Sequence, residues 1–117
     1  MALNFRNLVV LIVEDNAHMR KILVDVLKAL GIGQVFQADS GAKALQLIRH
    51  ETPDMIICDW QMEPMDGLEM THKIRTDPTN RAQFVPIIMM TGYSTHERVT
   101  QARDLGVTEF LIKPFTI

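Results

Sequence analysis

Short apolar runs alternate with amphipathic stretches along almost the whole chain. Five runs, at 8–13, 35–38, 55–58, 86–91 and 110–112, are brief and rich in Val, Ile, Leu or Met. An unbroken apolar run of this length is typical of a strand that is buried on both faces of a sheet. The pattern therefore predicts five strands, separated by segments with a different periodicity.

The clearest helical pattern follows the first run. The apolar residues that recur there at helical spacing are Met19, Ile22, Leu23, Val26, Leu27 and Leu30. The polar corner Glu14-Asp15-Asn16 can cap the start of this helix, and Gly31 ends it. Weaker helical patterns begin at Ser40, near Asp66 and near Ser94, whereas the polar stretch 76–84 predicts a loop.

Five strands alternating with four helices predict one α/β domain, with a doubly wound parallel sheet covered by helices on both faces. Ligands of such sheets bind outside the carboxyl ends of the strands. The polar residues that follow the predicted strands are Glu14, Asp15, Asp59, Thr91, Gly92 and Lys113. We expect them to meet at one edge of the sheet.

Carboxylates brought together at that edge repel one another, so at least one pKa rises or a cation is bound. Lys113 can offset one charge, and Mg²⁺, which is held by one or two carboxylates with phosphate oxygens and water, can offset more. An acid pair with a metal, the hydroxyl of Thr91 and Lys113 form a plausible cradle for phosphoryl transfer to an aspartate nucleophile such as Asp59. A single aspartate at a strand end ordinarily caps a helix or lies in a solvated turn. The hypothesis of a phosphoryl-transfer site rests instead on polar residues that follow four predicted strands in order.

Composition narrows the class of protein further. The chain has 117 residues, of which 47% are hydrophobic and 22% charged, as in one ordinary globular domain. A net charge of -2 argues against direct nucleic-acid binding, and the single cysteine, Cys58, excludes an internal disulfide and a multi-cysteine metal site. The sequence contains no apolar run long enough for a membrane span and no signal-peptide layout, so we expect a cytoplasmic domain.

The ordered motifs resemble the receiver domain of bacterial two-component response regulators, especially its single-domain chemotaxis members. The residues that carry the resemblance are Glu14-Asp15, Asp59, Met65-Asp66-Gly67, Thr91-Gly92 and Lys113-Pro114-Phe115. The similarity extends from about residue 8 to the end of the chain. It implies a flavodoxin-like sheet of order 2-1-3-4-5 and a cytoplasmic phosphoacceptor switch, which assists its own phosphorylation and dephosphorylation without being an enzyme.

The resemblance implies a metal site on the acidic residues. Asp59 would accept a phosphoryl group from the phosphohistidine of a sensor histidine kinase or a phosphotransfer protein. Asp15 and Asp59 would bind Mg²⁺ through their side chains, Gln61 through its backbone carbonyl, and Glu14 through a metal-bound water.

The same resemblance implies a switch. Thr91 would donate its hydroxyl to the phosphoryl group and Lys113 would pair with it, with Gly92 counted among the cofactor-binding positions. Phe110 would turn inward when Thr91 moves and would alter the surface of the fourth helix and fifth strand, where a downstream effector or motor-type target binds. The Lys113-Pro114 peptide bond is expected to be cis.

Members of this family continue with a fifth helix, whereas this sequence stops at Ile117. We therefore expect a receiver domain over residues 1–117 that is truncated before its last helix, or a dimer in which a second copy covers the gap. Without such cover, Leu23, Leu27 or neighbouring sheet residues would be poorly buried.

Three other functions compete with this reading. A haloacid-dehalogenase-type phosphotransferase also uses Asp, Thr, Lys and Mg²⁺, but Gln61 stands where its second aspartate belongs. A flavin module would need a phosphate-binding loop where Glu14-Asp15 repel phosphate. A receiver-like interaction module without phosphoryl-transfer chemistry would not need Glu14-Asp15, Asp59, Thr91 and Lys113, so their presence argues against it.

Overall fold

The computed structural model describes residues 4–92 and 96–112 and contains a five-stranded parallel sheet of order β2-β1-β3-β4-β5. The strands are β1 Val9–Val13, β2 Gln34–Ala38, β3 Met55–Asp59, β4 Ile87–Thr91 and β5 Glu109–Ile112. The helices are α1 Ala17–Ala29, α2 Gly41–Ile48, α3 Gly67–Thr76 and α4 His96–Asp104. The predicted alternation and the flavodoxin-like order are confirmed.

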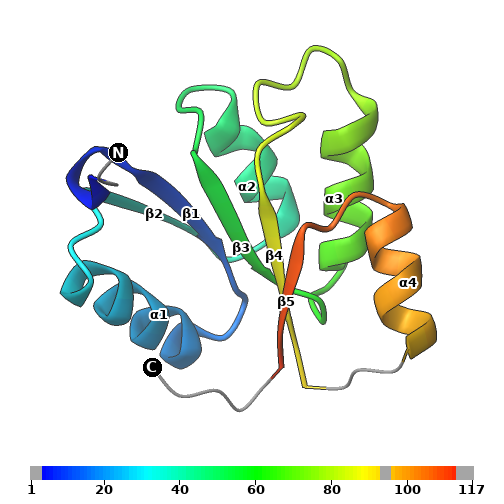
Figure 1. The fold of residues 1–117 in the computed structure, drawn as a ribbon, viewed down its shortest axis with the longest axis horizontal. Helices are drawn as coiled ribbons and strands as arrows, with labels where there is room; N and C mark the ends of the chain where they lie inside the picture. The colour runs from blue at the N-terminus through cyan, green and yellow to red at the C-terminus, as the bar shows by residue number, and fades with distance from the viewer. Residues whose placement is uncertain (1–3, 93–95, 113–117) are drawn as a thin grey trace.

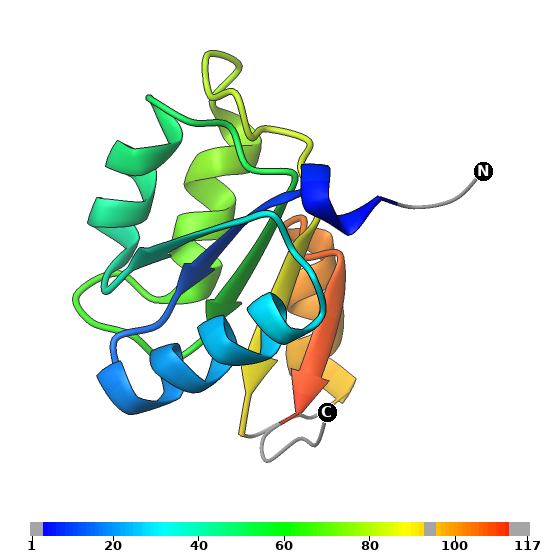
Figure 2. The same cartoon turned by 90° about the vertical axis from the view of Figure 1, so that its left-hand side faces the viewer.

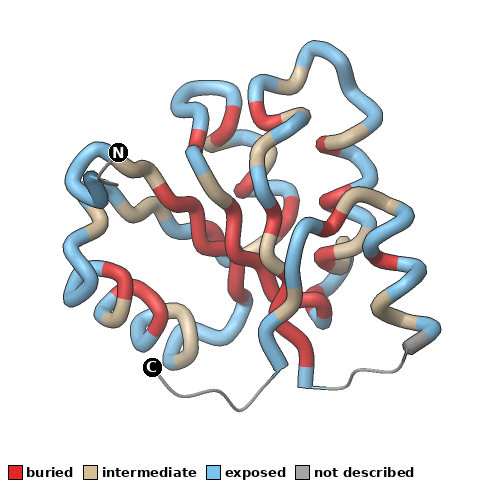
Figure 3. Tube along the Cα trace, in the orientation of Figure 1, coloured by how far each residue is buried: buried red, intermediate tan, exposed pale blue. Residues whose placement is uncertain are grey.

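Helices cover both faces of the sheet, as Figures 1 and 2 show, and each face has its own core. Val10 and Ile12 of β1 pack with Leu23, Val24 and Leu27 of α1. The alternate residues of β1 face the other side, where α2, α3 and α4 contribute the buried side chains. Because consecutive side chains of a strand point to opposite faces, a strand covered on both sides must be apolar throughout. The buried middle strands in Figure 3 follow from this requirement.

Side-chain caps fix the starts of three helices. Asn16 accepts a hydrogen bond from Met19 N at 2.9 Å, Ser40 from Lys43 N at 3.1 Å and Asp66 from Glu69 N at 2.8 Å. Each cap satisfies a backbone N–H group that has no partner within its helix. The predicted starts of α1, α2 and α3 are thereby confirmed, whereas the cap predicted at Ser94 lies outside the described residues.

The polar stretch predicted as a loop is tied down by Arg75 at the amino edge of the sheet. Its Nε donates to Gly106 O at 2.9 Å, and its Nη1 donates to Gln83 O at 2.8 Å. Gln83 Nε2 donates in return to Arg75 O at 3.2 Å. Partial burial lowers the pKa of Arg75 from its ordinary value, yet guanidinium stays charged at neutral pH. One side chain thus joins the end of α3 to two loops.

Exposed apolar side chains occur both on α1 and on the sheet. Leu23 and Leu27 are buried, whereas Ile22 of α1 and Leu111 and Ile112 at the end of β5 are exposed. The truncation before a fifth helix stays a prediction. Among the described residues, no helix is long and apolar enough to cross a membrane.

Candidate functional site

Three carboxylates meet at the carboxyl edge of the sheet. Glu14 and Asp15 follow β1, and Asp59 is the last residue of β3, the strand paired with β1. One carboxylate oxygen from each of the three lies within 4.8 Å of the others. The structure therefore brings together the three acids that the sequence places after these two strands.

The corner after β1 is held by its own backbone. Glu14 N donates to Ala38 O of β2 at 3.0 Å, and Glu14 O accepts from Arg20 Nη1 at 2.8 Å. Asn16 N donates to Glu14 Oε1 at 3.3 Å, and Glu14 is buried while Asp15 is exposed. Strand pairing and the first turns of α1 thus fix Glu14, and Asp15 faces solvent beside it.

Gly67 lets α3 begin against the end of β3. Its N–H donates to Trp60 O at 2.9 Å. A Cβ at this position would clash with the Asp59 carbonyl oxygen and would lie 2.8 Å from Cys58 Sγ and 2.8 Å from Met89 Sδ. The sequence singled out Gly67 only as part of a family motif; its physical role is the close approach that seats the Asp59 backbone.

Thr91 ends β4, the strand next to β3, and is 1% exposed. Gly92 follows it and is exposed, with open space where a Cβ would lie. Lys113 and Pro114 follow the last residue of β5, Ile112, but lie outside the described residues. The cis bond expected before Pro114 remains a prediction; among the described residues the cis peptide bond is Glu63-Pro64.

The donor set of the acidic cluster fits a hard divalent cation. Two oxygens bound directly to one Mg²⁺ are at most about 4.2 Å apart, because each Mg–O distance is about 2.1 Å. Oxygens already within 4.8 Å of one another need only small side-chain rotations, or one bridging water, to reach that geometry. Carboxylate oxygens are also the ligands that Mg²⁺ prefers. Glu14, Asp15 and Asp59 are therefore chemically suited to hold Mg²⁺.

A cavity of about 470 Å³ adjoins the cluster. The residues that line it are Asp15, Trp60, Gln61, Met62, Glu63, Asp66 and Arg98. Gln61 thus lies beside the acidic cluster, as expected for a residue two positions after Asp59. Trp60 is buried, and its ring lies near that of Phe110.

Arg98 is a residue of this cavity that sequence reasoning missed. Its Cζ lies 4.1 Å from the centre of the Trp60 ring, a cation–π contact. Trp60 also contacts Phe110, which is half-buried; the two ring centres are 6.3 Å apart and the planes are tilted by 35°. No sequence signal connects position 98 with position 60, because the contact depends on how α4 packs against the sheet.

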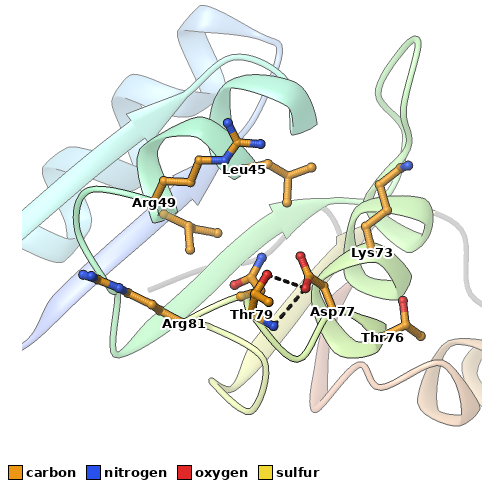
Figure 4. Close-up of a pocket in the computed structure, with 9 residues that line it drawn as sticks. Leu45, Arg49, Lys73, Thr76, Asp77, Thr79 and Arg81 are labelled. Carbon is orange, nitrogen blue, oxygen red and sulfur yellow. Dashed lines mark hydrogen bonds between the residues drawn. The ribbon is translucent and has the colours of Figure 1, made fainter.

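A second cavity, of about 490 Å³, lies at the opposite edge of the sheet, away from the acidic cluster. It is formed by the ends of α2 and α3 and the loop after α3, as Figure 4 shows, with Arg49, Lys73 and Arg81 around it. Asp77 sits among them, accepting hydrogen bonds from Thr79 N at 2.9 Å and Thr79 Oγ1 at 2.6 Å. None of the residues predicted for the phosphoryl site lines this cavity.

Cys58 belongs to the core. It is fully buried, and burial first, then the charges of Asp59, Asp66 and Glu14, raises the pKa of its thiol. A thiol that stays protonated is a poor nucleophile. The chemistry of this edge therefore rests on oxygen ligands.

Comparison with known proteins gives one family. The model of the response regulator receiver domain matches residues 10–117. Chemotaxis protein CheY-3 of Vibrio cholerae serotype O1 is 32% identical over 111 residues, which are 95% of this chain and 84% of that protein.

Solved structures agree with this assignment. Chemotaxis protein CheY4 of Vibrio cholerae superimposes with a TM-score of 0.86 at 30% identity, covering 93% of this chain and 88% of that one. The receiver domain of the histidine kinase CKI1 from Arabidopsis thaliana, complexed with Mg²⁺ and BeF₃⁻, gives a TM-score of 0.82 at 34% identity and covers 93% and 83% of the two chains.

Proposed function

The chain belongs to the family of response regulator receiver domains, and from that membership we propose that Asp59 is the residue that accepts the phosphoryl group. Receiver domains are phosphoacceptor signalling switches rather than classical enzymes. The observation that supports Asp59 most directly is the cluster of three carboxylate oxygens within 4.8 Å of one another.

Position distinguishes the three acids. Asp59 ends the central strand β3, between β1 with its two acids and β4 with Thr91. Glu14 is tied into the backbone corner, and Asp15 faces solvent. Asp59 is therefore the carboxylate with both a metal-binding acid pair and a hydroxyl on neighbouring strands, which is the arrangement that phosphoryl transfer to an acid needs.

The proposed metal site holds Mg²⁺ on Asp15 and Asp59, with Gln61 contributing its backbone carbonyl and Glu14 acting through a bound water. A bound Mg²⁺ would neutralise charge on the phosphoryl oxygens. The Mg²⁺ complex of the CKI1 receiver domain supports this assignment. In this chain, Glu14 and Asp15 would place negatively charged carboxylates beside Asp59 and so attract Mg²⁺ to the acceptor residue.

The proposed switch couples the phosphoryl group to β5 and α4. The buried Thr91 hydroxyl and Lys113 bind the phosphoryl oxygens beside Gly92, and the displacement of Thr91 lets Phe110 move inward. Phe110 lies against Trp60, and Trp60 contacts Arg98 of α4. A movement of Phe110 would therefore change the packing of α4. The output surface is then α4 with β5, available to an effector or a motor-type target.

We assign the donor to a histidine kinase or phosphotransfer protein in the cytoplasm. The family membership and the relatives named as chemotaxis proteins support a place in a signalling relay.

Incubation with Mg²⁺ and acetyl phosphate, followed by intact-protein mass spectrometry, tests the assignment. We expect one added phosphoryl mass in the wild type and none in Asp59→Asn. Asp66→Asn is the matched control: it removes a carboxylate from the same cavity while asparagine still caps α3. Labelling of Asp59→Asn to the same extent as the wild type would refute Asp59 as the acceptor.

A further inference from the structure

The cavity beside the acidic cluster carries an unfavourable charge for the reactant it has to admit. Of the described residues that line it, Asp15, Glu63 and Asp66 are acidic and Arg98 is basic. A phosphate donor carries two negative charges at neutral pH, so Glu63 and Asp66, which have no proposed role in holding Mg²⁺, repel it as it enters. Mg²⁺ and Lys113 are assigned to the phosphoryl oxygens at Asp59, whereas a cation that lines the cavity can offset the repulsion along the donor's path.

Arg98 is held where it can do so. Its guanidinium lies over the Trp60 ring, with Cζ 4.1 Å from the ring centre. Trp60 is itself fixed, because it is buried, its backbone N–H donates to Met90 O at 2.9 Å and its ring lies against Phe110. The side chain of Arg98 on α4 thus has a defined contact in the cavity beside the acidic cluster.

The chemistry of Arg98 suits a phosphate group. A guanidinium is always charged and carries five N–H donors in one plane, and two of them can meet two oxygens of a phosphate group. Arg98 lines the same cavity as Asp15 and Gln61, so its charge lies beside the path of an anion that enters there.

We propose that Arg98 binds the anionic phosphodonor as it enters the cavity beside Asp59 and so sets the rate of phosphoryl capture; this inference rests on the proposed function. In the step that follows, an Asp59 carboxylate oxygen forms a bond to phosphorus. The bond from phosphorus to the bridging oxygen of acetyl phosphate breaks, and acetate leaves with the electron pair. No proton is transferred, and total charge is conserved.

The test compares Arg98→Gln with the wild type at low acetyl phosphate and fixed Mg²⁺. We expect the rate of phosphoryl labelling to fall about tenfold, since a charge-assisted hydrogen bond is lost. Arg98→Lys keeps the positive charge but not the planar guanidinium, so its labelling rate should lie between those of the wild type and Arg98→Gln. Arg103→Gln removes the same charge from an exposed position on the same helix and should match the wild type.

Three further readouts separate capture of the donor from a structural role. The difference between wild type and Arg98→Gln should shrink in 1 M salt, where the Debye length is only about 3 Å. Hydrolysis of the phosphorylated protein should proceed at the same rate in both, because water is an uncharged reactant. Emission from Trp60, the single tryptophan, should change in Arg98→Gln but not in Arg103→Gln.

The outcomes distinguish this inference from the proposed function. A wild type that takes up no phosphoryl group refutes the proposed function. Normal labelling of the wild type with an equal rate in Arg98→Gln refutes the role of Arg98 alone. A slow Arg98→Gln whose defect persists unchanged in 1 M salt also refutes it, because that result indicates a structural defect.

Discussion

The two edges of the sheet differ in what surrounds their charged groups. At the carboxyl edge, Glu14, Asp15 and Asp59 place like charges within 4.8 Å of one another. At the amino edge, the Arg75 guanidinium donates to two carbonyl groups and so meets opposite partial charges. The amino edge therefore uses its polar groups to stabilise the fold, whereas the carboxyl edge gathers groups whose repulsion a ligand can relieve.

The two cavities repeat this contrast. The one beside the acidic cluster is lined by Asp15, Glu63 and Asp66, whereas the one at the amino edge is surrounded by Arg49, Lys73 and Arg81 (Figure 4). Acidic side chains thus predominate among the charged residues that line the first cavity and basic ones among those that line the second. Changes at the amino edge should thus alter stability, and changes at the carboxyl edge should alter ligand binding and chemistry.

Gly67 is the strongest challenge to this division, because it makes the carboxyl edge depend on packing. Gly67→Ala would force a Cβ into the Asp59 carbonyl oxygen and to 2.8 Å from both Cys58 Sγ and Met89 Sδ. We expect a loss of about 3 kcal/mol in the free energy of unfolding, measured by urea denaturation, since backbone cannot yield as a flexible side chain does.

Gly92→Ala is the matched control for stability at the same edge. No atom lies within 4 Å of the position of its Cβ, so the free energy of unfolding should stay within about 0.5 kcal/mol of the wild type. Equal stability of Gly67→Ala and Gly92→Ala would show that α3 can move away from β3 without cost, and the packing argument would fail.

Arg75→Met tests the amino edge directly. The substitution keeps much of the aliphatic side chain but removes the donors to Gly106 O and Gln83 O, leaving two part-buried carbonyl groups without their partner. We expect unfolding to become easier by about 2 kcal/mol. Phosphoryl labelling of the folded protein should be unchanged, because the guanidinium is at the far edge of the sheet from Asp59.

The control for this variant is Arg103→Met, which removes an exposed arginine. It should change stability by less than about 0.5 kcal/mol. If Arg75→Met were as stable as this control, the hydrogen bonds at the amino edge would contribute nothing net to folding, and the contrast between the edges would disappear.

The sequence predicted the carboxyl edge far better than the amino edge, and for a physical reason. The apolar runs of β1, β3 and β4 are visible because these strands are covered on both faces. Parallel strands then place Glu14, Asp15 and Asp59 at a common edge without any knowledge of tertiary packing. Local cap chemistry likewise predicted the starts at Asn16 and Ser40.

What the sequence did not reveal depends on contacts between distant segments. Arg75 meets Gly106 across 31 positions, and Arg98 meets Trp60 only because of where α4 packs. Neither arginine belongs to a periodic pattern, so each reads as an ordinary charge on a solvated helix. Gly67 was similarly invisible as a packing residue, because the steric need for glycine arises from β3 and β4.

Binding of Mg²⁺ sharpens the contrast at the carboxyl edge. A cation that binds only the folded chain raises the free energy of unfolding by about 1.4 kcal/mol at ten times its dissociation constant. Asp15→Asn should lose most of that gain at the same Mg²⁺ concentration, because one carboxylate oxygen of the cluster becomes a neutral amide. Thermal unfolding with and without Mg²⁺ measures the effect.

Asp104→Asn, which removes an exposed acid from α4, should respond to Mg²⁺ as the wild type does. An equal response in Asp15→Asn and Asp104→Asn would mean that Mg²⁺ acts on surface charge in general. That result would contradict the proposal that Glu14, Asp15 and Asp59 bind Mg²⁺.

Asp77 offers the smallest effect and the most direct comparison of an acid at the amino edge with those at the carboxyl edge. Hydrogen bonds from the Thr79 side chain and then from its backbone N–H hold the pKa of Asp77 below its ordinary value of 3.8, with Arg49 adding to the effect. Thr79→Ala removes the first of these causes, so the pKa of Asp77 should rise toward the ordinary value in an NMR titration of the carboxyl carbon.

A pKa lowered on folding favours the folded state above the unfolded pKa, and this contribution disappears as the pH falls through the folded pKa. Thr79→Ala should therefore cost stability at neutral pH and little at a pH below both values. Thr76→Ala is the control, because its hydroxyl donates to His72 O rather than to Asp77; a similar change of the Asp77 pKa in both variants would show that the turn at Thr79 does not hold this charge.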